Sequence, residues 1–245
     1  MIAALLLAAG GPVFPKPVPM TIAPLGAPVA PLTAQATLAP DDVVARYAAA
    51  LATLKEPRVF VVEYTLEQTG PRTLDQTHRI FRNGGDERDE TLAVNGNRST
   101  TPVVRIFRGR PYRYTVAALA PRTSAYIFTF AGRHRDGKHV DYVFDLTPKA
   151  GTVPAFTFTQ VTIDGITFLP QSVSFVETRH DGRGAITFAK SEKYWVARSA
   201  SAQANVPGGA AHEQVTFSHW RFPTSLPRST FAMPRALPTA PPALP

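Results

Sequence analysis

The chain has 245 residues, and its 26 lysines and arginines against 18 aspartates and glutamates give a formal net charge of +8. A hydrophobic fraction of 44% excludes a disordered polyelectrolyte, and the absence of cysteine excludes disulfides, thiolate metal sites, cysteine nucleophiles and a lipid-modified cysteine. The unusual feature is proline, because its 24 copies make up about one residue in ten.

The prolines divide the chain into two Pro-rich ends and one domain. Residues 1–40 hold eight prolines and residues 223–245 hold seven, so the other nine are spread over residues 41–222. A Pro-rich segment without apolar periodicity cannot bury itself, so we expect a disordered tether at one end and a Pro-rich tail at the other. The middle part has 23 basic and 18 acidic residues and the length of a single domain with its own core.

An apolar run, Met1 to Gly10, opens the chain and is too short to span a bilayer. It resembles the hydrophobic region of a secretory signal, although no lysine or arginine precedes it and the small-residue site Ala34-Gln35-Ala36 lies far downstream. We expect the protein to be exported to the periplasm or cell envelope of a bacterium. The alternative is an ordinary flexible apolar tail.

Residues 42–54 predict the one clear helix of the chain. Val44, Tyr47 and Leu51 recur at intervals of three and four residues, which places them on one face. Two aspartates stand at the start, where the positive end of the helix dipole favours them, and Pro57 ends the pattern.

The rest of the domain predicts β-strands, because apolar and polar residues alternate along it. In residues 59–68, for example, Phe60, Val62 and Tyr64 fall on one face and glutamates and threonine on the other. Hairpin turn pairs separate such runs, at Asn83-Gly84-Gly85, Asn95-Gly96, Asp136-Gly137, Asp164-Gly165 and Asp181-Gly182. The expected fold class is mainly β: a large curved antiparallel sheet of about 10–11 strands, an incomplete β-barrel, with the N-terminal helix packed on or capping its concave face.

Aromatic residues are unusually frequent on the side of the strands that should face inward, and one short helix is too small to cover them all. They form either a packed core or the wall of an apolar ligand cavity. The candidate cavity residues are Phe60, Tyr64, Tyr126, Phe128, Phe130, Tyr142, Phe144, Phe156, Phe158, Phe175, Phe188 and Phe217.

The order of these elements resembles the bacterial outer-membrane lipoprotein-sorting (LolA/LolB-like) superfamily. The helix leads into an uninterrupted meander, Asp164 to Pro170 precedes the strand Gln171–Glu177, and a glycine turn at 180–184 precedes another strand. The resemblance implies an incomplete barrel around a hydrophobic cavity that binds acyl chains, with a helix as its lid. This chain departs from the pattern in lacking a lipid-attachment cysteine and in its long Pro-rich ends, and no motif identifies a ligand-contacting residue.

A basic segment interleaves arginines with aromatic residues at 105–114. Arg105, Arg108, Arg110 and Arg113 are candidates for binding an anionic head group at the mouth of the cavity. The alternative is a solvated strand pair whose arginines meet the acidic block Asp86 to Glu90. Because nucleic-acid-binding domains usually lack such an acidic block, we expect no nucleic-acid partner.

A second polar cluster at 134–141 holds two histidines and two aspartates. His134, Asp136, His139 and Asp141 would suit a metal-dependent hydrolase if a hairpin brought them together, but three cationic residues in the same turn oppose cation binding. The dipeptide His212-Glu213 stands on a late strand without an evident partner. No nucleophile elbow, phosphate loop, dinucleotide fingerprint or zinc-protease motif is present, so we expect neither an enzyme nor a cofactor.

The sequence therefore favours an exported protein that binds a lipid or acyl chain, with a lipid, an acylated protein or a membrane surface as its partner. The alternative is a scaffold or interaction module of the cell envelope, with the same sheet, a packed core and no ligand.

Overall fold

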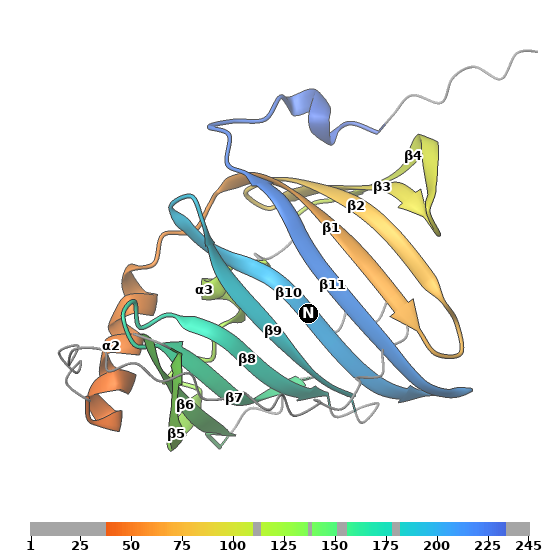
Figure 1. Cartoon of the computed structure of the whole chain (residues 1–245). Helices are drawn as coiled ribbons and strands as arrows, with labels where there is room; N and C mark the ends of the chain where they lie inside the picture. The colour runs from red at the N-terminus through yellow and green to blue at the C-terminus, as the bar shows by residue number, and fades with distance from the viewer. Residues whose placement is uncertain (1–37, 110–113, 137–138, 151–155, 178–181, 234–245) are drawn as a thin grey trace, which may run out of the picture.

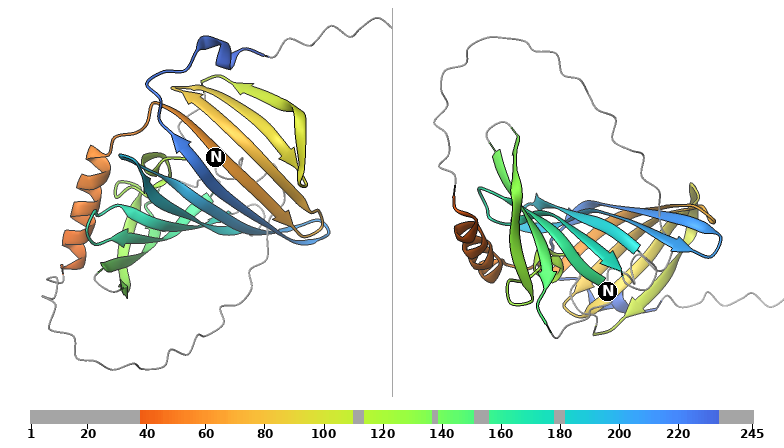
Figure 2. Two further views of the ribbon diagram at one scale, coloured as in Figure 1. Left: turned by 45° about the horizontal axis from the view of Figure 1, so that its top comes forward. Right: turned by 90° about the horizontal axis from the view of Figure 1, so that it is seen from below.

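The computed structural model describes residues 38–109, 114–136, 139–150, 156–177 and 182–233. Within them, eleven antiparallel strands form one strongly curved sheet that does not close into a barrel (Figures 1 and 2). The predicted fold class is thereby confirmed. No helix in this part of the chain is long and apolar enough to cross a membrane.

The strands are long, because the alternating segments run on between tight turns. Their bounds are β1 Val59–Thr69, β2 Leu74–Asn83, β3 Asp86–Val94, β4 Asn97–Phe107, β5 Tyr126–Asp136, β6 His139–Pro148, β7 Phe156–Asp164, β8 Pro170–Glu177, β9 Gly182–Ser191, β10 Tyr194–Val206 and β11 Gly209–Arg221.

The strand order is β4-β3-β2-β1-β11-β10-β9-β8-β7-β6-β5. Two meanders, β1–β4 and β5–β11, are thus joined where the first strand pairs with the last, with Tyr64 opposite Phe217. The edges of the sheet are β4 and β5, and the chain must cross the whole sheet to pass from one to the other. This crossover distinguishes the fold from a single meander.

Turn chemistry explains the hairpins. Asn95 and Gly96 have φ angles of 49° and 76° between β3 and β4, as a type I′ turn requires. At the end of β7 the Asp164 side chain accepts hydrogen bonds from the backbone N–H groups of Ile166 and Thr167 and from the Thr167 hydroxyl. Burial opposes ionisation of Asp164, but these hydrogen bonds outweigh it and lower the pKa of its carboxyl.

The predicted helix is α2, Pro40–Thr53, which lies beside the β5–β8 end of the sheet (Figures 1 and 2). Its Tyr47 is fully buried, packs against the Phe128 ring at 5.5 Å between centroids, and donates a hydrogen bond to the Pro121 carbonyl at 2.7 Å. The aspartates lie in its first turn without capping it. Two short helices were not predicted: α3, Val116–Leu119, and the 3-10 helix η1, Arg228–Phe231.

Residues 228–233, which we call the C-terminal segment, pack against β3. Phe231 is buried, Arg88 donates hydrogen bonds to the Thr230 and Ala232 carbonyls, and Arg108 donates to the Phe231 carbonyl. This stretch belongs to the Pro-rich tail predicted for residues 223–245, and its described part contacts the sheet as far as Ala232.

Candidate functional site on the concave face

The concave face carries most of the predicted cavity residues. Nine are buried and belong to one continuous hydrophobic cluster: Phe60, Tyr64, Tyr126, Tyr142, Phe144, Phe158, Phe175, Phe188 and Phe217. Phe128 is half-buried against the cluster, and Phe130 is 38% exposed. The side chain of Phe156 lies outside the described residues.

The crossover from β4 to β5 covers part of this face, and α3 lies behind the sheet in Figure 1. Tyr114, with φ of 75°, packs edge-on against the rings of Phe60 and Phe217, at 6.2 and 5.7 Å between centroids. Thr115 forms a β-bridge with Val196 on β10. The cover that α2 alone could not supply therefore comes from this crossover, which the sequence did not predict.

A cavity of about 410 Å³ lies beside this crossover and opens to solvent. Its walls combine small apolar residues of α3 and the following loop with two aromatic rings from the sheet, and its polar groups are Glu56 and Arg122. The lining residues are Glu56, Ala117, Ala118, Ala120, Pro121, Arg122, Ala125, Tyr126 and Phe158. Two predicted cavity residues, Tyr126 and Phe158, are among them.

The polar groups at this cavity are held by the crossover itself. Thr115 donates a hydrogen bond from its hydroxyl to Glu56 Oε1 at 2.8 Å, and Arg122 donates from Nη2 to the Ala117 carbonyl at 3.3 Å. Arg122 also lines a second cavity of about 160 Å³ on the α2 side, together with Ala48 and Leu51. Alanines carry little sequence signal, so this site was not predicted.

The β1–β4 part of the concave face is polar and internally paired. Arg82 and Glu87 form a fully buried ion pair, 2.7 Å between Nη1 and Oε2. His78 stacks on Tyr64 at 4.6 Å and contacts Asp89 Oδ1 through Nδ1 at 2.8 Å. Two acidic residues of the predicted block thus pair with β2.

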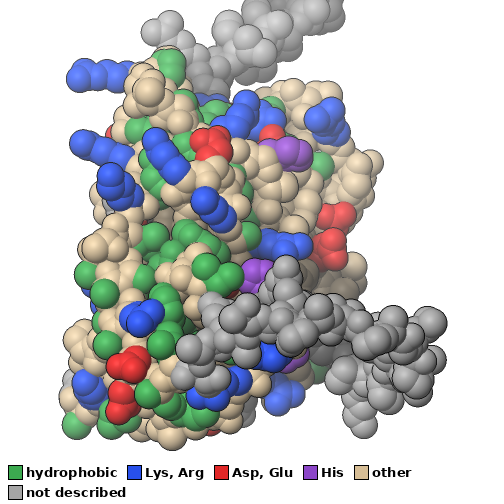
Figure 3. All heavy atoms as spheres, turned by 60° about the vertical axis from the view of Figure 1, so that its left-hand side comes forward, with side chains coloured by type: hydrophobic (Ala, Val, Ile, Leu, Met, Phe, Trp, Pro, Cys, Tyr) green, Lys and Arg blue, Asp and Glu red, His purple; other side chains and the backbone are tan. Residues whose placement is uncertain are grey.

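Of the four candidate head-group arginines, the structure describes Arg105 and Arg108. Arg108 is 59% exposed at its side chain and is engaged by Asp86 at 2.6 Å and by the C-terminal segment. Arg105 lies on β4 opposite Asp89, and Arg110 and Arg113 fall outside the described residues. On the side of the molecule that carries α2, Lys and Arg side chains are scattered among hydrophobic ones (Figure 3).

The hairpin of β5 and β6 sets His134 opposite Asp141 and Asp136 opposite His139. Asp141 is buried and accepts a hydrogen bond from Gln171 Nε2 at 2.8 Å, whereas His134 and His139 are exposed. The side chain of Asp136 lies outside the described residues. Among the side chains that are described, no group of three or more His, Asp and Glu is arranged to hold a metal ion.

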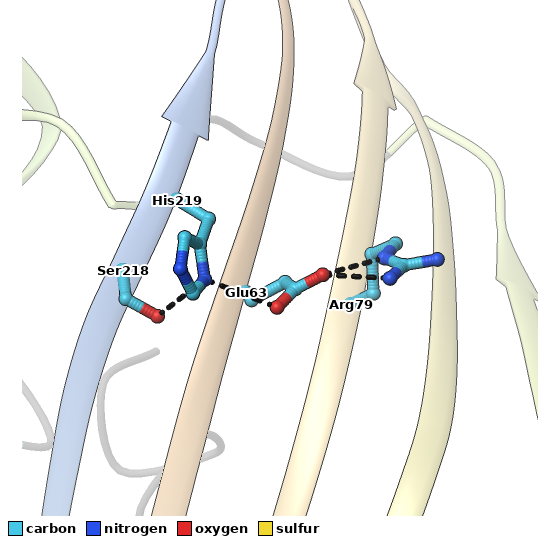
Figure 4. Close-up of polar contacts among 4 residues, drawn as sticks. All are labelled: Glu63, Arg79, Ser218 and His219. Atoms are coloured by element: carbon cyan, nitrogen blue, oxygen red, sulfur yellow. Dashed lines mark hydrogen bonds and ion pairs between the residues drawn. The ribbon is translucent and has the colours of Figure 1, made fainter.

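The convex face carries a Ser-His-Glu contact between β11 and β1 (Figure 4). Ser218 Oγ and Glu63 Oε2 both approach the same nitrogen of His219, Nδ1, at 3.3 and 3.1 Å, whereas a catalytic triad uses both ring nitrogens. Arg79 donates two hydrogen bonds to Glu63 Oε1. Burial opposes ionisation of Glu63, but Arg79 and then His219 outweigh it and lower its pKa. The arrangement is a surface ion-pair network in which Glu63 and Arg79 are half-buried and His219 is exposed.

His212 and Glu213, for which the sequence suggests no partner, also have no hydrogen-bond partner among the described residues. Both ring nitrogens of His212 and both carboxylate oxygens of Glu213 are buried with no hydrogen-bond partner in the described part of the chain. His212 is 1% exposed and Glu213 is 0% exposed. Burial lowers the pKa of His212 and raises the pKa of Glu213 to about 9.

No protein-family model matches this chain, and no curated protein matches it. Among solved structures, it is similar to a LolA superfamily protein from Nitrosomonas europaea, with 12% identity, a TM-score of 0.44, and coverage of 80% of this chain and 99% of the other. A putative outer membrane lipoprotein-sorting protein domain from Vibrio parahaemolyticus has 14% identity and a TM-score of 0.44, with coverage of 78% of this chain and 96% of the other. A DUF1329 family protein from Desulfovibrio piger has 12% identity and a TM-score of 0.44, with coverage of 78% of this chain and 97% of the other.

Proposed function

We propose that the protein is an exported, non-catalytic carrier or receptor that holds an acyl chain in the cavity between α3 and the β5–β7 end of the sheet. The observation that carries the proposal is the cavity itself. Its 410 Å³ falls in the range of small-molecule sites, and alanine, proline and aromatic side chains form most of its wall.

The chemistry of the wall suits a hydrocarbon chain with a polar end. Tyr126 and Phe158 contribute aromatic side chains to the wall, and burial of methylene groups against such a wall is worth about 0.8 kcal/mol for each group removed from water. Arg122, exposed beside the same cavity, offers a guanidinium to a phosphate or carboxylate. Arg105 lies on β4 and Arg108 directly after it, at the other edge of the sheet, whereas Arg122 lines the cavity, so this proposal assigns the head group to Arg122.

Titration of delipidated full-length protein with a fluorescent fatty acid tests the proposal. Ala118→Trp fills the cavity from α3 and is expected to weaken binding at least about tenfold, because the added ring occupies the volume of the chain. Ala49→Trp is the matched control, because Ala49 is exposed on α2 and does not line the cavity. Equal binding by the two variants would contradict the proposed site.

Export is the second half of the proposal, and it rests on the apolar run at residues 1–10. Expression of the full chain in a Gram-negative bacterium, followed by fractionation, is expected to place the protein in the periplasmic or envelope fraction. Recovery of all of the protein, at full length, in the cytoplasm would contradict it.

One observation favours the alternative, a scaffold with a packed interior. Tyr114 fills the space above Phe60 and Phe217, so that part of the concave face holds protein rather than ligand. If the fluorescent fatty acid does not bind and native mass spectrometry finds no co-purifying lipid, the scaffold is the better account.

A further inference from the structure

Two side chains of opposite charge line the 410 Å³ cavity without pairing with each other. Glu56 belongs to the connection between α2 and β1, and Arg122 belongs to the loop after α3. Among the described residues neither of them forms an ion pair, whereas the buried Arg82 and Glu87 of the same concave face pair at 2.7 Å. Glu56 and Arg122 therefore each keep a charge that a ligand can neutralise.

A buried hydroxyl group holds the Glu56 carboxylate in place. Thr115 is 1% exposed and donates its hydrogen bond to Glu56 Oε1 at 2.8 Å. Thr115 is itself fixed, because its carbonyl accepts hydrogen bonds from the backbone N–H groups of Ala118 and Leu119 and its backbone forms the bridge to Val196 on β10. The other carboxylate oxygen, Oε2, has no hydrogen bond within the described part of the chain, so it is available to a donor from a ligand.

The Arg122 guanidinium is anchored close to this carboxylate. It donates from Nη2 to the Ala117 carbonyl at 3.3 Å, and its remaining N–H groups have no partner in the residues that the structure describes. Ala117 is two residues from Thr115, and two residues of chain span at most about 7 Å. The groups that anchor the guanidinium and the carboxylate are thus close enough for one small head group to reach both.

A ligand that satisfies both side chains carries an anion and a cation. A phosphate matches the fork of N–H donors on a guanidinium, and a primary ammonium matches the free oxygen of a carboxylate. A quaternary ammonium has no N–H group and cannot make this hydrogen bond. A purely anionic head group would leave Glu56 without a partner and close to a charge of its own sign.

We infer that the cavity binds the head group of a zwitterionic lipid, with the phosphate at Arg122, a primary ammonium at Glu56 and the first part of the acyl chain against the apolar wall. This inference rests on the proposed function and deepens it, because it names the ligand class and adds Glu56 as the residue that selects it.

Competition binding on the delipidated full-length protein tests the inference at neutral pH. Palmitoyl lysophosphatidylethanolamine, lysophosphatidylglycerol and lysophosphatidylcholine carry the same acyl chain and phosphate, and each is used to displace a fluorescent fatty acid. The wild-type protein is expected to prefer lysophosphatidylethanolamine to the other two by about tenfold. The net charge of +8 attracts the anionic lysophosphatidylglycerol at long range, so this preference requires a local contact with the ammonium.

Glu56→Gln tests the ammonium contact. The variant keeps an oxygen that accepts the Thr115 hydrogen bond but loses the negative charge, so the preference for lysophosphatidylethanolamine over lysophosphatidylglycerol is expected to fall below about threefold. Glu67→Gln, at an exposed position of β1 that does not line the cavity, is the matched control and should keep the wild-type preference.

Arg122→Gln tests the phosphate contact separately. It is expected to weaken lysophosphatidylethanolamine and lysophosphatidylglycerol alike by about tenfold, and to leave monopalmitoylglycerol, which has no phosphate, within about twofold. Arg72→Gln, at an exposed position between β1 and β2, is the matched control and should change none of the three.

The outcomes distinguish the inference from the proposed function. If the wild-type protein binds neither the fluorescent fatty acid nor any of the competitors, the proposed function fails and the inference fails with it. If lipids bind but the wild-type protein does not prefer lysophosphatidylethanolamine to both other lysophospholipids, or if Glu56→Gln retains the preference, only the inference is overturned.

Discussion

Buried charged side chains on the concave face show two different solutions to the same physical problem. Arg82 and Glu87 compensate each other at 2.7 Å, and Arg82 also donates from Nε to the Gly84 carbonyl. Glu213 has no such compensation and remains neutral by keeping its proton. Removing a partner from the first pair and removing the acid from the second site should therefore have opposite effects on stability.

Glu213→Gln is expected to stabilise the protein above mildly acidic pH. An unfolded chain loses the Glu213 proton above its ordinary pKa of 4.5, whereas the folded chain keeps it up to about 9, so the free energy of unfolding falls as pH rises through that window. The glutamine does not ionise, and the expected gain at pH 8 is on the order of 1–3 kcal/mol by urea unfolding. Glu67→Gln, on an exposed position of β1, is the control; an identical pH slope for wild type and Glu213→Gln would refute the assignment.

Arg82→Met should cost about 3–5 kcal/mol in the free energy of unfolding, because it leaves Glu87 buried without its guanidinium partner. Adding Glu87→Leu to the same chain is expected to recover most of that loss, since no uncompensated charge remains. Urea unfolding of the two single variants and the double variant measures the coupling. Additive losses would mean that the pair does not act as a unit.

Turns and helices that are specified by residues close together in the sequence were predictable. The Asn95-Gly96 turn needs positive φ at both residues, and the three- and four-residue spacing of Val44, Tyr47 and Leu51 specifies α2. Elements that depend on distant contacts were not predictable. The four residues of α3 form a helix against β10. The 3-10 helix η1 lies in a Pro-rich stretch, and nothing in that stretch marks Phe231 as the residue that is buried against the sheet.

The C-terminal segment should stabilise the outer hairpin of the sheet. Phe231→Ala removes a buried ring that packs beside the Arg88 and Arg108 hydrogen bonds, and it is expected to cost about 3 kcal/mol. Faster amide hydrogen exchange confined to β3 and β4 would show the effect. Met233→Ala, at a residue exposed by 64%, is the control; uniform acceleration over all strands would contradict a local role.

The candidate site was only partly predictable from the sequence, because part of it depends on contacts between residues far apart in the chain. Period-two alternation identifies the concave aromatics, including Phe158 and Tyr126, because alternation depends on neighbours in sequence. The alanines of the cavity wall lie on α3 and in the loop after it, and no short stretch of sequence specifies how this connection packs against the sheet. Arg122 was missed because a single arginine in a loop has no pattern.

At the scale of the whole molecule, the β1–β11 pairing makes the two meanders one cooperative unit. Phe217→Ala removes a ring that contacts Tyr64, Tyr114 and Trp220 at this pairing, and it is expected to cost about 3–5 kcal/mol. Unfolding followed by tryptophan fluorescence and by circular dichroism should still give coincident transitions. Separate midpoints would mean that the meanders unfold independently. Ile127→Ala, exposed on the edge strand β5, should change little.

The same pairing also sets the order in which a newly made chain can complete its sheet. Strand β1 is among the first parts of the domain to leave the ribosome, but its second neighbour, β11, is the last strand to follow. Until then the inner edge of β1 has unpaired N–H and C=O groups, the kind of edge that pairs with other chains. Such long-range closure slows folding. A protein with this topology therefore benefits from a holding chaperone until its final strand is available.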